Sequence, residues 1–110
     1  MKTPLFSIIT ITFNAESTLE PTLCSVAAQQ ENDYEYLIVD GASKDGTVAL
    51  ARQYDCVTRI ISEPDRGLYD AMNKGIKAAT GEYLVFLNAG DSLYAPDTLK
   101  KLHDFIGENR

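Results

Sequence analysis

Polar side chains that could bind a phosphorylated ligand follow each of four short apolar runs in the chain. These groups are Thr12–Asn14, Asp40–Ser43, Glu63–Gly67 and Asn88–Asp91. Their amides, hydroxyls and carboxylates can hydrogen-bond to the N–H and O–H groups of a ligand. The guanidinium of Arg66 can pair with a phosphate, and a carboxylate can hold a divalent cation. The chemistry on offer is therefore recognition of a polar, negatively charged small molecule.

The elements that must position these groups alternate between strand and helix. Apolar and β-branched runs predict strands over Leu5–Thr12, Tyr34–Asp40, Val57–Ser62 and Glu82–Asn88, and helical spacing fills the segments after them. Four such repeats favour the α/β class, with a Rossmann-like, mostly parallel sheet of about four strands and alternating helices. Ligands of such sheets bind beyond the carboxyl ends of the strands, where the polar groups fall.

Several residues predict where the helices begin and end. Ser17 and Glu20 have the spacing of a capping box, so Ser17 is expected to be the N-cap of the first helix. Gly81 is placed to end the third helix. Pro96 is expected to open the last helix and Gly107 to end it.

The charge balance excludes some classes of partner. The chain has 110 residues, with 10 Lys plus Arg against 16 Asp plus Glu, and a formal net charge of −6. Binding to the phosphates of DNA or RNA needs clustered positive charge, so we expect no nucleic-acid partner. The length corresponds to one small domain, so residues 1–110 are expected to form a single unit.

No apolar run is long enough to cross a membrane. Pro4, Ser7 and Thr10 interrupt the first run, which therefore reads as a strand and not as a secretion signal. Cys24 and Cys56 form no CxxC pair and are expected to be buried free thiols. We therefore expect a cytoplasmic protein.

The common nucleotide-binding motifs are absent. The segment after the first strand is Thr12–Glu16, with none of the glycines of a dinucleotide-binding G-x-G-x-x-G turn. A P-loop and the G-x-S-x-G elbow of the α/β-hydrolases are also missing. A receiver-like signalling domain is disfavoured because no pair of acids follows the first strand.

Four ordered segments together resemble the nucleotide-sugar half of the family-2 glycosyltransferases, which have the GT-A fold. They are Ser7–Asn14, Val39–Thr47, Glu63–Gly75 and Gly81–Asp91, and they cover nearly the whole chain. The third contains G-L-Y-D-A-M-N-K-G, which is similar to bacterial polysaccharide-assembly members of the colanic-acid type. The resemblance implies an enzyme that moves a sugar, with inversion, from a nucleotide-diphosphate sugar to a saccharide or lipid-linked acceptor. A lipid-linked acceptor would place it at the inner face of the membrane.

The resemblance also implies which residues bind the donor. Phe13 would stack on the base, unless its ring belongs to the core. Asp40 would accept hydrogen bonds from the base or ribose, unless it caps the turn that follows it. Arg66 would reach a phosphate, unless it pairs with a neighbouring acid. The full set of expected nucleotide-sugar-binding residues is Thr12, Phe13, Asn14, Glu16, Asp40, Arg66 and Asn88.

Two other stretches have different expected roles. Ser43–Thr47 is expected to be structural, with Ser43 and Asp45 satisfying free amides at the start of a short helix. In the family, paired acids at the positions that correspond to Asn88–Asp91 hold a divalent metal that bridges the two phosphates. Here Asn88 and Gly90 replace two of those acids, so a weakened Mg²⁺ or Mn²⁺ site is expected on Asp91 alone.

No catalytic residue is assigned. The family's general base lies after the metal segment, and no residue before Arg110 matches it. The expected function is therefore the donor-binding half of a glycosyltransferase, and the alternative is a non-catalytic nucleotide-sugar-binding or assembly module. A sheet without its continuing strands leaves an exposed edge, so a homodimer is also expected.

Overall fold

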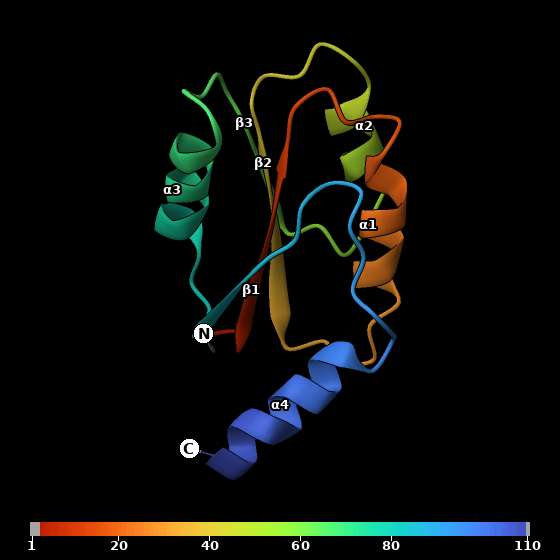
Figure 1. The fold of residues 1–110 in the computed structure, drawn as a ribbon, viewed down its shortest axis with the longest axis vertical. Coiled ribbons are helices and arrows are strands. Elements are labelled where there is room, and N and C mark those ends of the chain that lie inside the picture. Colours follow the sequence, from red (N-terminus) through yellow and green to blue (C-terminus); the bar gives the residue numbers. More distant parts are fainter. Residues whose placement is uncertain (1–2, 110) are drawn as a thin grey trace.

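A strand followed by a helix occurs four times in the computed structural model, which describes residues 3–109. In chain order the elements are β1 (Phe6–Thr12), α1 (Leu19–Ala27), β2 (Tyr34–Asp40), α2 (Thr47–Arg52), β3 (Arg59–Ser62), α3 (Leu68–Ala78), β4 (Tyr83–Phe86) and α4 (Thr98–Asn109). The arrangement is shown in Figure 1. The alternation predicted from the sequence is confirmed.

The strands form one parallel sheet in the order β3-β2-β1-β4. The register pairs Thr12 with Asp40 and Asp40 with Ser62, so the last residues of β1, β2 and β3 lie side by side. The chain steps outward from β1 to β3 and then crosses back to place β4 on the other side of β1. The segments that leave β1 and β4 therefore flank the point where the strand order reverses, which is the usual ligand position in open α/β sheets.

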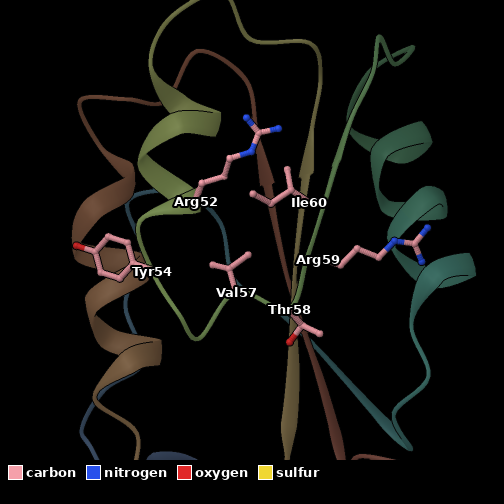
Figure 2. A pocket seen from close by; sticks show the side chains of 6 residues that line it. All are labelled: Arg52, Tyr54, Val57, Thr58, Arg59 and Ile60. Carbon is pink, nitrogen blue, oxygen red and sulfur yellow. The ribbon is translucent and has the colours of Figure 1, made fainter.

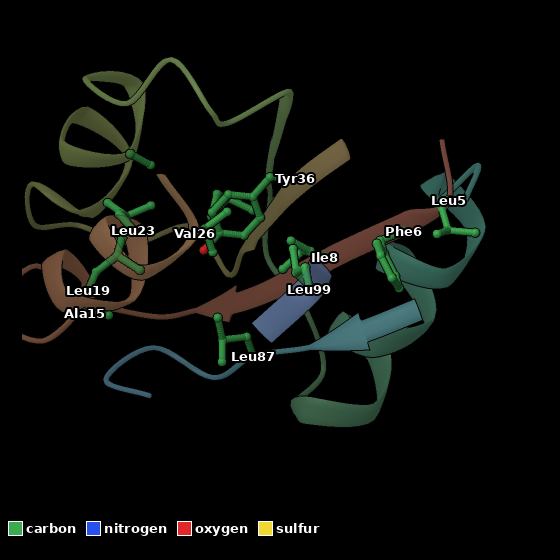
Figure 3. Close-up of a cluster of buried hydrophobic side chains, with 12 residues drawn as sticks. Leu5, Phe6, Ile8, Ala15, Leu19, Leu23, Val26, Tyr36, Leu87 and Leu99 are labelled. Carbon is green, nitrogen blue, oxygen red and sulfur yellow. The ribbon is translucent and has the colours of Figure 1, made fainter. Parts of the chain in front are cut away.

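Helices cover both faces of the sheet, α1 and α2 on one side and α3 on the other (Figure 1). Alternate residues of a strand point to opposite faces, and the core divides accordingly. Phe6 and Ile8 of β1 pack with α1 and α2, whereas Ile9 of β1 packs with Ala71 of α3. The larger of the two clusters is drawn in Figure 3. Because both faces are buried, β1 reads as a nearly continuous apolar run.

Two features of the core depend on single side chains. Tyr36 is fully buried on β2, and its hydroxyl shares a 2.7 Å hydrogen bond with Thr10 of β1. Burial raises the pKa of the Tyr36 phenol, so it stays neutral. Gly75 lets α3 lie close to the sheet, because a Cβ there would come within 2.9 Å of Cγ2 of Ile9.

Several predicted boundaries are wrong by a few residues. The N-cap of α1 is Thr18, not Ser17, because the amides of both Thr18 and Leu19 already donate to the carbonyl of Ala15. The expected capping box therefore does not form. Gly107 lies inside α4, which continues to Asn109, and no neighbouring atom lies within 4 Å of where a Cβ at Gly107 would be. Gly107 does not adopt the positive φ of a glycine that caps a helix, so the helix continues through it.

Within residues 3–109, no helix is both long and apolar enough to cross a membrane. Cys24 and Cys56 are free thiols, as expected. The expectation that both are buried is wrong for Cys24, which is exposed on α1, whereas Cys56 is half-buried against the core.

Candidate functional site

The loops that leave β1 and β2 are joined by hydrogen bonds through Asn14. Its backbone N–H donates to Oγ of Ser43 at 2.7 Å, and its side-chain Oδ1 accepts from the backbone N–H of Lys44 at 2.9 Å. The φ angle of Asn14 is +48°, in the left-handed region that asparagine tolerates better than most residues. The asparagine after Phe13 thus has a physical reason: Asn14 turns the chain and fixes the backbone next to Phe13.

The carboxylate of Asp40 is buried at the end of β2, with only 1% of the residue exposed. Oδ1 accepts hydrogen bonds from the hydroxyls of Thr12 and Ser43, at 2.7 and 2.5 Å. Oδ2 accepts from the backbone N–H of Ser43 at 2.8 Å and from the hydroxyl of Ser62 at 2.9 Å. Asp40 therefore ties together the ends of three strands and the turn that follows β2.

These hydrogen bonds also decide the charge of Asp40. Burial by itself raises the pKa of the carboxyl, but the donors from Ser43, Thr12 and Ser62 outweigh that effect and lower the pKa below its usual value. Asp40 is therefore ionised at neutral pH, with its charge balanced by donors of the protein itself.

Of the two residues expected to satisfy amides at the start of α2, Asp45 does so and Ser43 does not. The hydroxyl oxygen of Ser43 instead accepts from the backbone N–H of Asn14. Oδ1 of Asp45 accepts from the hydroxyl of Thr47 and, at 3.0 Å, from the backbone N–H of the same residue, and the hydrogen bond from the hydroxyl is the main cause that lowers the pKa of Asp45. Oε1 of Glu16 accepts from the backbone N–H of Gly46, also at 3.0 Å. Glu16, expected to bind the donor, thus faces the start of α2.

Two adjoining cavities lie beyond the carboxyl end of β1. One, of about 380 Å³, lies between the loops after β1 and β4 and is lined by Asn14 and Asn88. The other, of about 340 Å³, lies between β1 and the start of α3 and is lined by Asp65. Phe13 is 66% exposed and borders both cavities, so the suggestion that it belongs to the core is wrong. Ile11 and Leu68 also line both cavities, and the two can therefore serve one ligand.

Asp65 lies against Gly41, which has no side chain. A Cβ placed on Gly41 would come within 2.7 Å of Oδ2 of Asp65 and 3.4 Å of Cδ1 of Phe13. The carboxylate of Asp65 therefore occupies space beside Phe13 that a larger residue at position 41 would fill. Its Oδ1 accepts from the backbone N–H of Gly67 at 3.1 Å, which holds the loop in place.

Arg66 is exposed next to this cavity. Its backbone N–H donates to Oδ2 of Asp70 at 2.8 Å, so the neighbouring acid binds its main chain. Among the described residues, the Arg66 guanidinium forms no ion pair. Gly67, which follows Arg66 and is the N-cap of α3, has a φ angle of +114°, a conformation that glycine adopts readily.

The loop after β4 is fixed by the hydroxyl of Thr22 on α1. This hydroxyl donates to the backbone carbonyl of Asp91 at 2.5 Å and accepts from the backbone N–H of Gly90 at 2.8 Å. Gly90 has a φ of +97°, which explains a glycine at this turn. Asp91 is exposed. In the part of the chain that the structure describes, no group of three or more His, Cys, Asp or Glu residues could hold a metal by itself.

The model of glycosyl transferase family 2 matches residues 7–110. The chain belongs to this family. It is 44% identical over 113 residues to the PGL/p-HBAD biosynthesis glycosyltransferase of Mycobacterium bovis, covering 99% of this chain and 44% of the relative. It is 36% identical to the putative teichuronic acid biosynthesis glycosyltransferase TuaG of Bacillus subtilis, covering 96% of this chain and 43% of that protein. The chain thus spans less than half the length of these curated relatives.

Solved structures show the same fold. Residues 1–349 of TarS from S. aureus in complex with UDP-GlcNAc match with a TM-score of 0.87 and 28% identity, over 94% of this chain and 31% of that one. The mannosyltransferase PcManGT from Pyrobaculum calidifontis in complex with GDP-Man and Mn²⁺ matches with a TM-score of 0.79 and 29% identity, over 90% and 31%. The predicted resemblance to the family-2 glycosyltransferases and the GT-A-like α/β fold are both confirmed.

The fold of this family-2 chain separates the expected site residues into two groups. Phe13, Asn14 and Asn88 line the first cavity. Asp40 and Glu16 line neither of the two, and their carboxylates accept hydrogen bonds from the protein's own donors. Thr12 borders the second cavity, but its hydroxyl donates to Asp40.

Sequence reasoning missed Asp65 and Leu68 as cavity residues. Both lie at or just after the loop that leaves β3, which was already singled out as a strand end. Asp65 could have been found from its place in the sequence: it lies two residues before Gly67, in a loop at the same edge of the sheet as Phe13.

A separate cavity of about 350 Å³ lies beside the beginning of β3. Figure 2 shows that the guanidinium groups of Arg52 and Arg59 on its border extend in different directions, that of Arg59 toward α3. Two guanidinium groups that point apart cannot bind the same phosphate together, so this cavity is a weaker candidate for a phosphate site than the strand ends.

Proposed function

We propose that the chain binds a nucleotide-diphosphate sugar across the two adjoining cavities and serves as the donor-binding part of a glycosyltransferase. The observation that carries the proposal is that Phe13 is exposed between the two cavities, at the switch point of the sheet. An aromatic face with polar groups on either side suits a ligand with a flat base at one end and a diphosphate at the other.

Different residues of the site would contact different parts of the ligand. The Phe13 ring offers a stacking face to the base, next to the mostly apolar cavity of Ile11 and Leu68. Asn14 and Asn88, which border the other cavity, provide amides for hydroxyl and phosphate oxygens. Arg66 lies exposed at the same edge with a guanidinium that can pair with phosphate. Asp40 and Thr12 act by positioning, since their hydrogen bonds hold the strand ends in register.

The residues present fit a divalent cation that is held mainly by the substrate. Asp91 is the single carboxylate in the segment Asn88–Asp91, and Thr22 holds its loop in place. Mg²⁺ commonly binds through one or two carboxylates with substrate phosphates and water completing the shell. When bound, such a cation would stabilise negative charge on the leaving diphosphate. The complex of PcManGT with GDP-Man and Mn²⁺ supports a metal in a relative of the same fold.

Transfer to a saccharide or lipid-linked acceptor, with inversion, is the reaction we propose for the enzyme. The complexes of TarS with UDP-GlcNAc and of PcManGT with GDP-Man support a nucleotide-sugar donor. The relatives named for PGL/p-HBAD and teichuronic acid biosynthesis support a glycoconjugate product. A lipid-linked acceptor would bring the protein to the inner face of the membrane.

Calorimetric titration of the chain with UDP and GDP, with and without Mn²⁺, tests the binding proposal. Saturable binding of at least one nucleotide that is strengthened by Mn²⁺ is expected, and a failure of all of them to bind would refute it. A transfer assay with nucleotide sugars and lipid-linked saccharides then separates an enzyme from a non-catalytic binding module. The module predicts binding with no product formed.

A further inference from the structure

The second cavity presents one ionisable side chain, Asp65, beside the aromatic face of Phe13. The other residues lining it are Ile11, Thr12, Phe13, Gly67, Leu68 and Ala71. None of these six side chains is charged, and the one hydroxyl among them, that of Thr12, donates to Asp40. A flat ligand stacked on Phe13 would therefore have its edge read chiefly by the carboxylate of Asp65.

The position of Asp65 depends on Gly41. A Cβ at position 41 would lie 2.7 Å from Oδ2 of Asp65, so any larger residue there would displace the carboxylate. Oδ1 is held by the backbone N–H of Gly67 at 3.1 Å, whereas Oδ2 has no hydrogen bond or ion pair among the described residues. Each carboxylate oxygen has two lone pairs, so both oxygens can still accept from a ligand.

An ionised carboxylate accepts hydrogen bonds and donates none, which makes it selective among bases. The Watson–Crick edge of guanine carries two adjacent donors, N1–H and the N2 amino group, which match the two carboxylate oxygens. Uracil offers one N3–H between two carbonyl oxygens that would face the negative charge. Adenine and cytosine each place a ring-nitrogen acceptor next to their amino donor.

We propose that Asp65 selects guanine, so that the donor is a guanosine diphosphate sugar. This proposal rests on the proposed function, because it places the base of the donor on Phe13. The paired, charge-assisted hydrogen bonds to N1–H and N2–H are parallel, and such bidentate pairs are the stronger class of hydrogen bond. Because Gly41 has no side chain, the carboxylate of Asp65 has room to lie beside Phe13 and meet the base there.

Calorimetric titration with GDP, UDP and ADP in the presence of Mn²⁺ tests the assignment. The unmodified chain is expected to bind GDP about 10- to 100-fold more tightly than UDP or ADP, the range that a bidentate base contact provides. Asp65→Asn replaces one acceptor by a donor that can meet a carbonyl of uracil. This variant is expected to remove the preference for GDP. Asp104→Asn, an exposed acid on α4, is the matched control and should leave the preference intact.

Gly41→Ala provides a second route to the same result. The added Cβ displaces the carboxylate without removing it, so the preference for GDP should fall while circular dichroism shows a folded chain. Tighter binding of UDP than of GDP by the unmodified chain, or an unchanged GDP/UDP ratio in Asp65→Asn, would overturn the assignment of guanine and leave the proposed function standing. Failure of every nucleotide to bind would overturn both.

Discussion

The hydroxyl of Thr12 donates to Oδ1 of Asp40 at 2.7 Å, and this hydrogen bond joins the last residues of two neighbouring parallel strands. Both side chains are almost completely buried. The loops that border the two cavities start from these residues, so the geometry of the site depends on a contact that lies beneath it. Loss of this contact should act first on stability and through it on binding.

Asp40→Asn is expected to destabilise the protein by about 1–3 kcal/mol at neutral pH. The amide keeps one acceptor, but its NH₂ group cannot accept from the remaining donors, Ser43 and Ser62. Urea unfolding at pH 7 measures the change. An unaltered midpoint would show that the buried carboxylate is not needed to hold the strand ends.

The same carboxyl predicts a pH dependence of stability. The pKa of Asp40 in the folded chain lies below its value of 3.8 in the unfolded chain, so the unfolded state binds the proton more readily. Its stabilising contribution is complete well above pH 3.8 and is lost as the pH falls through the folded-state pKa. Unfolding free energies measured from pH 6 to pH 2 should fall less steeply in Asp40→Asn than in the unmodified chain.

Two glycines in helices should respond in opposite directions to alanine. Gly75→Ala would place a Cβ 2.9 Å from Cγ2 of Ile9, so it is expected to cost about 1–3 kcal/mol of stability. The Cβ of Gly107→Ala on α4 would meet no atom within 4 Å apart from the helix's own nearby backbone, so the variant should stabilise the protein by up to about 1 kcal/mol, because alanine favours the helix. Thermal unfolding of both variants makes the comparison. Equal effects would contradict the close approach of α3 to β1.

Phe13→Ala should weaken nucleotide binding while leaving stability nearly unchanged. Loss of base stacking costs about 1–3 kcal/mol of affinity, and the ring is too exposed to contribute much to folding. Phe105→Ala is the matched control, since that ring is 62% exposed on α4, outside both cavities. Titration with a nucleoside diphosphate should separate the two variants. Equal affinities would place the base elsewhere.

Asp91→Asn should reduce the gain in nucleotide affinity that Mn²⁺ provides. Loss of an outer-shell partner costs roughly 10- to 100-fold in metal affinity, and loss of a direct ligand should cost at least as much. Affinity measured in EDTA should not change, which distinguishes this effect from misfolding. Asp55→Asn, an exposed acid in the turn before β3, serves as control. A full Mn²⁺ response in Asp91→Asn would exclude Asp91 as the ligand.

The exposed edge of β4 predicts self-association. β4 is the end strand of the sheet, and Leu84 on it is 40% exposed. Apolar edge strands pair readily with other chains, so a dimer is expected in sedimentation experiments at high concentration. Leu84→Lys should shift the equilibrium toward monomer, whereas Leu102→Lys on α4, equally exposed at 40%, should not. A chain that stays monomeric at high concentration would contradict this expectation.

The order of the elements and the edge of the sheet that carries the site could be predicted from the sequence. Both depend on local pattern: continuous apolar runs such as that of β1 mark strands buried on both faces, and polar residues follow their ends. Helix ends were less predictable. Ser17 and Glu20 have the spacing of a capping box. The backbone carbonyl of Ala15, however, accepts from the amides of Thr18 and Leu19, and the N-cap is Thr18.

Which strand-end residues border the two cavities was decided by the tertiary structure alone. Asp40 and Asp65 are both acids at strand ends, and nothing in their local sequence distinguishes a buried carboxylate from an available one. The register of β1, β2 and β3 brings donors from Thr12 and Ser62 to Asp40 and engages its charge inside the protein. The glycine at position 41 leaves space for Asp65 beside Phe13. A buried charge requires donors from other strands, and only the folded sheet brings them together.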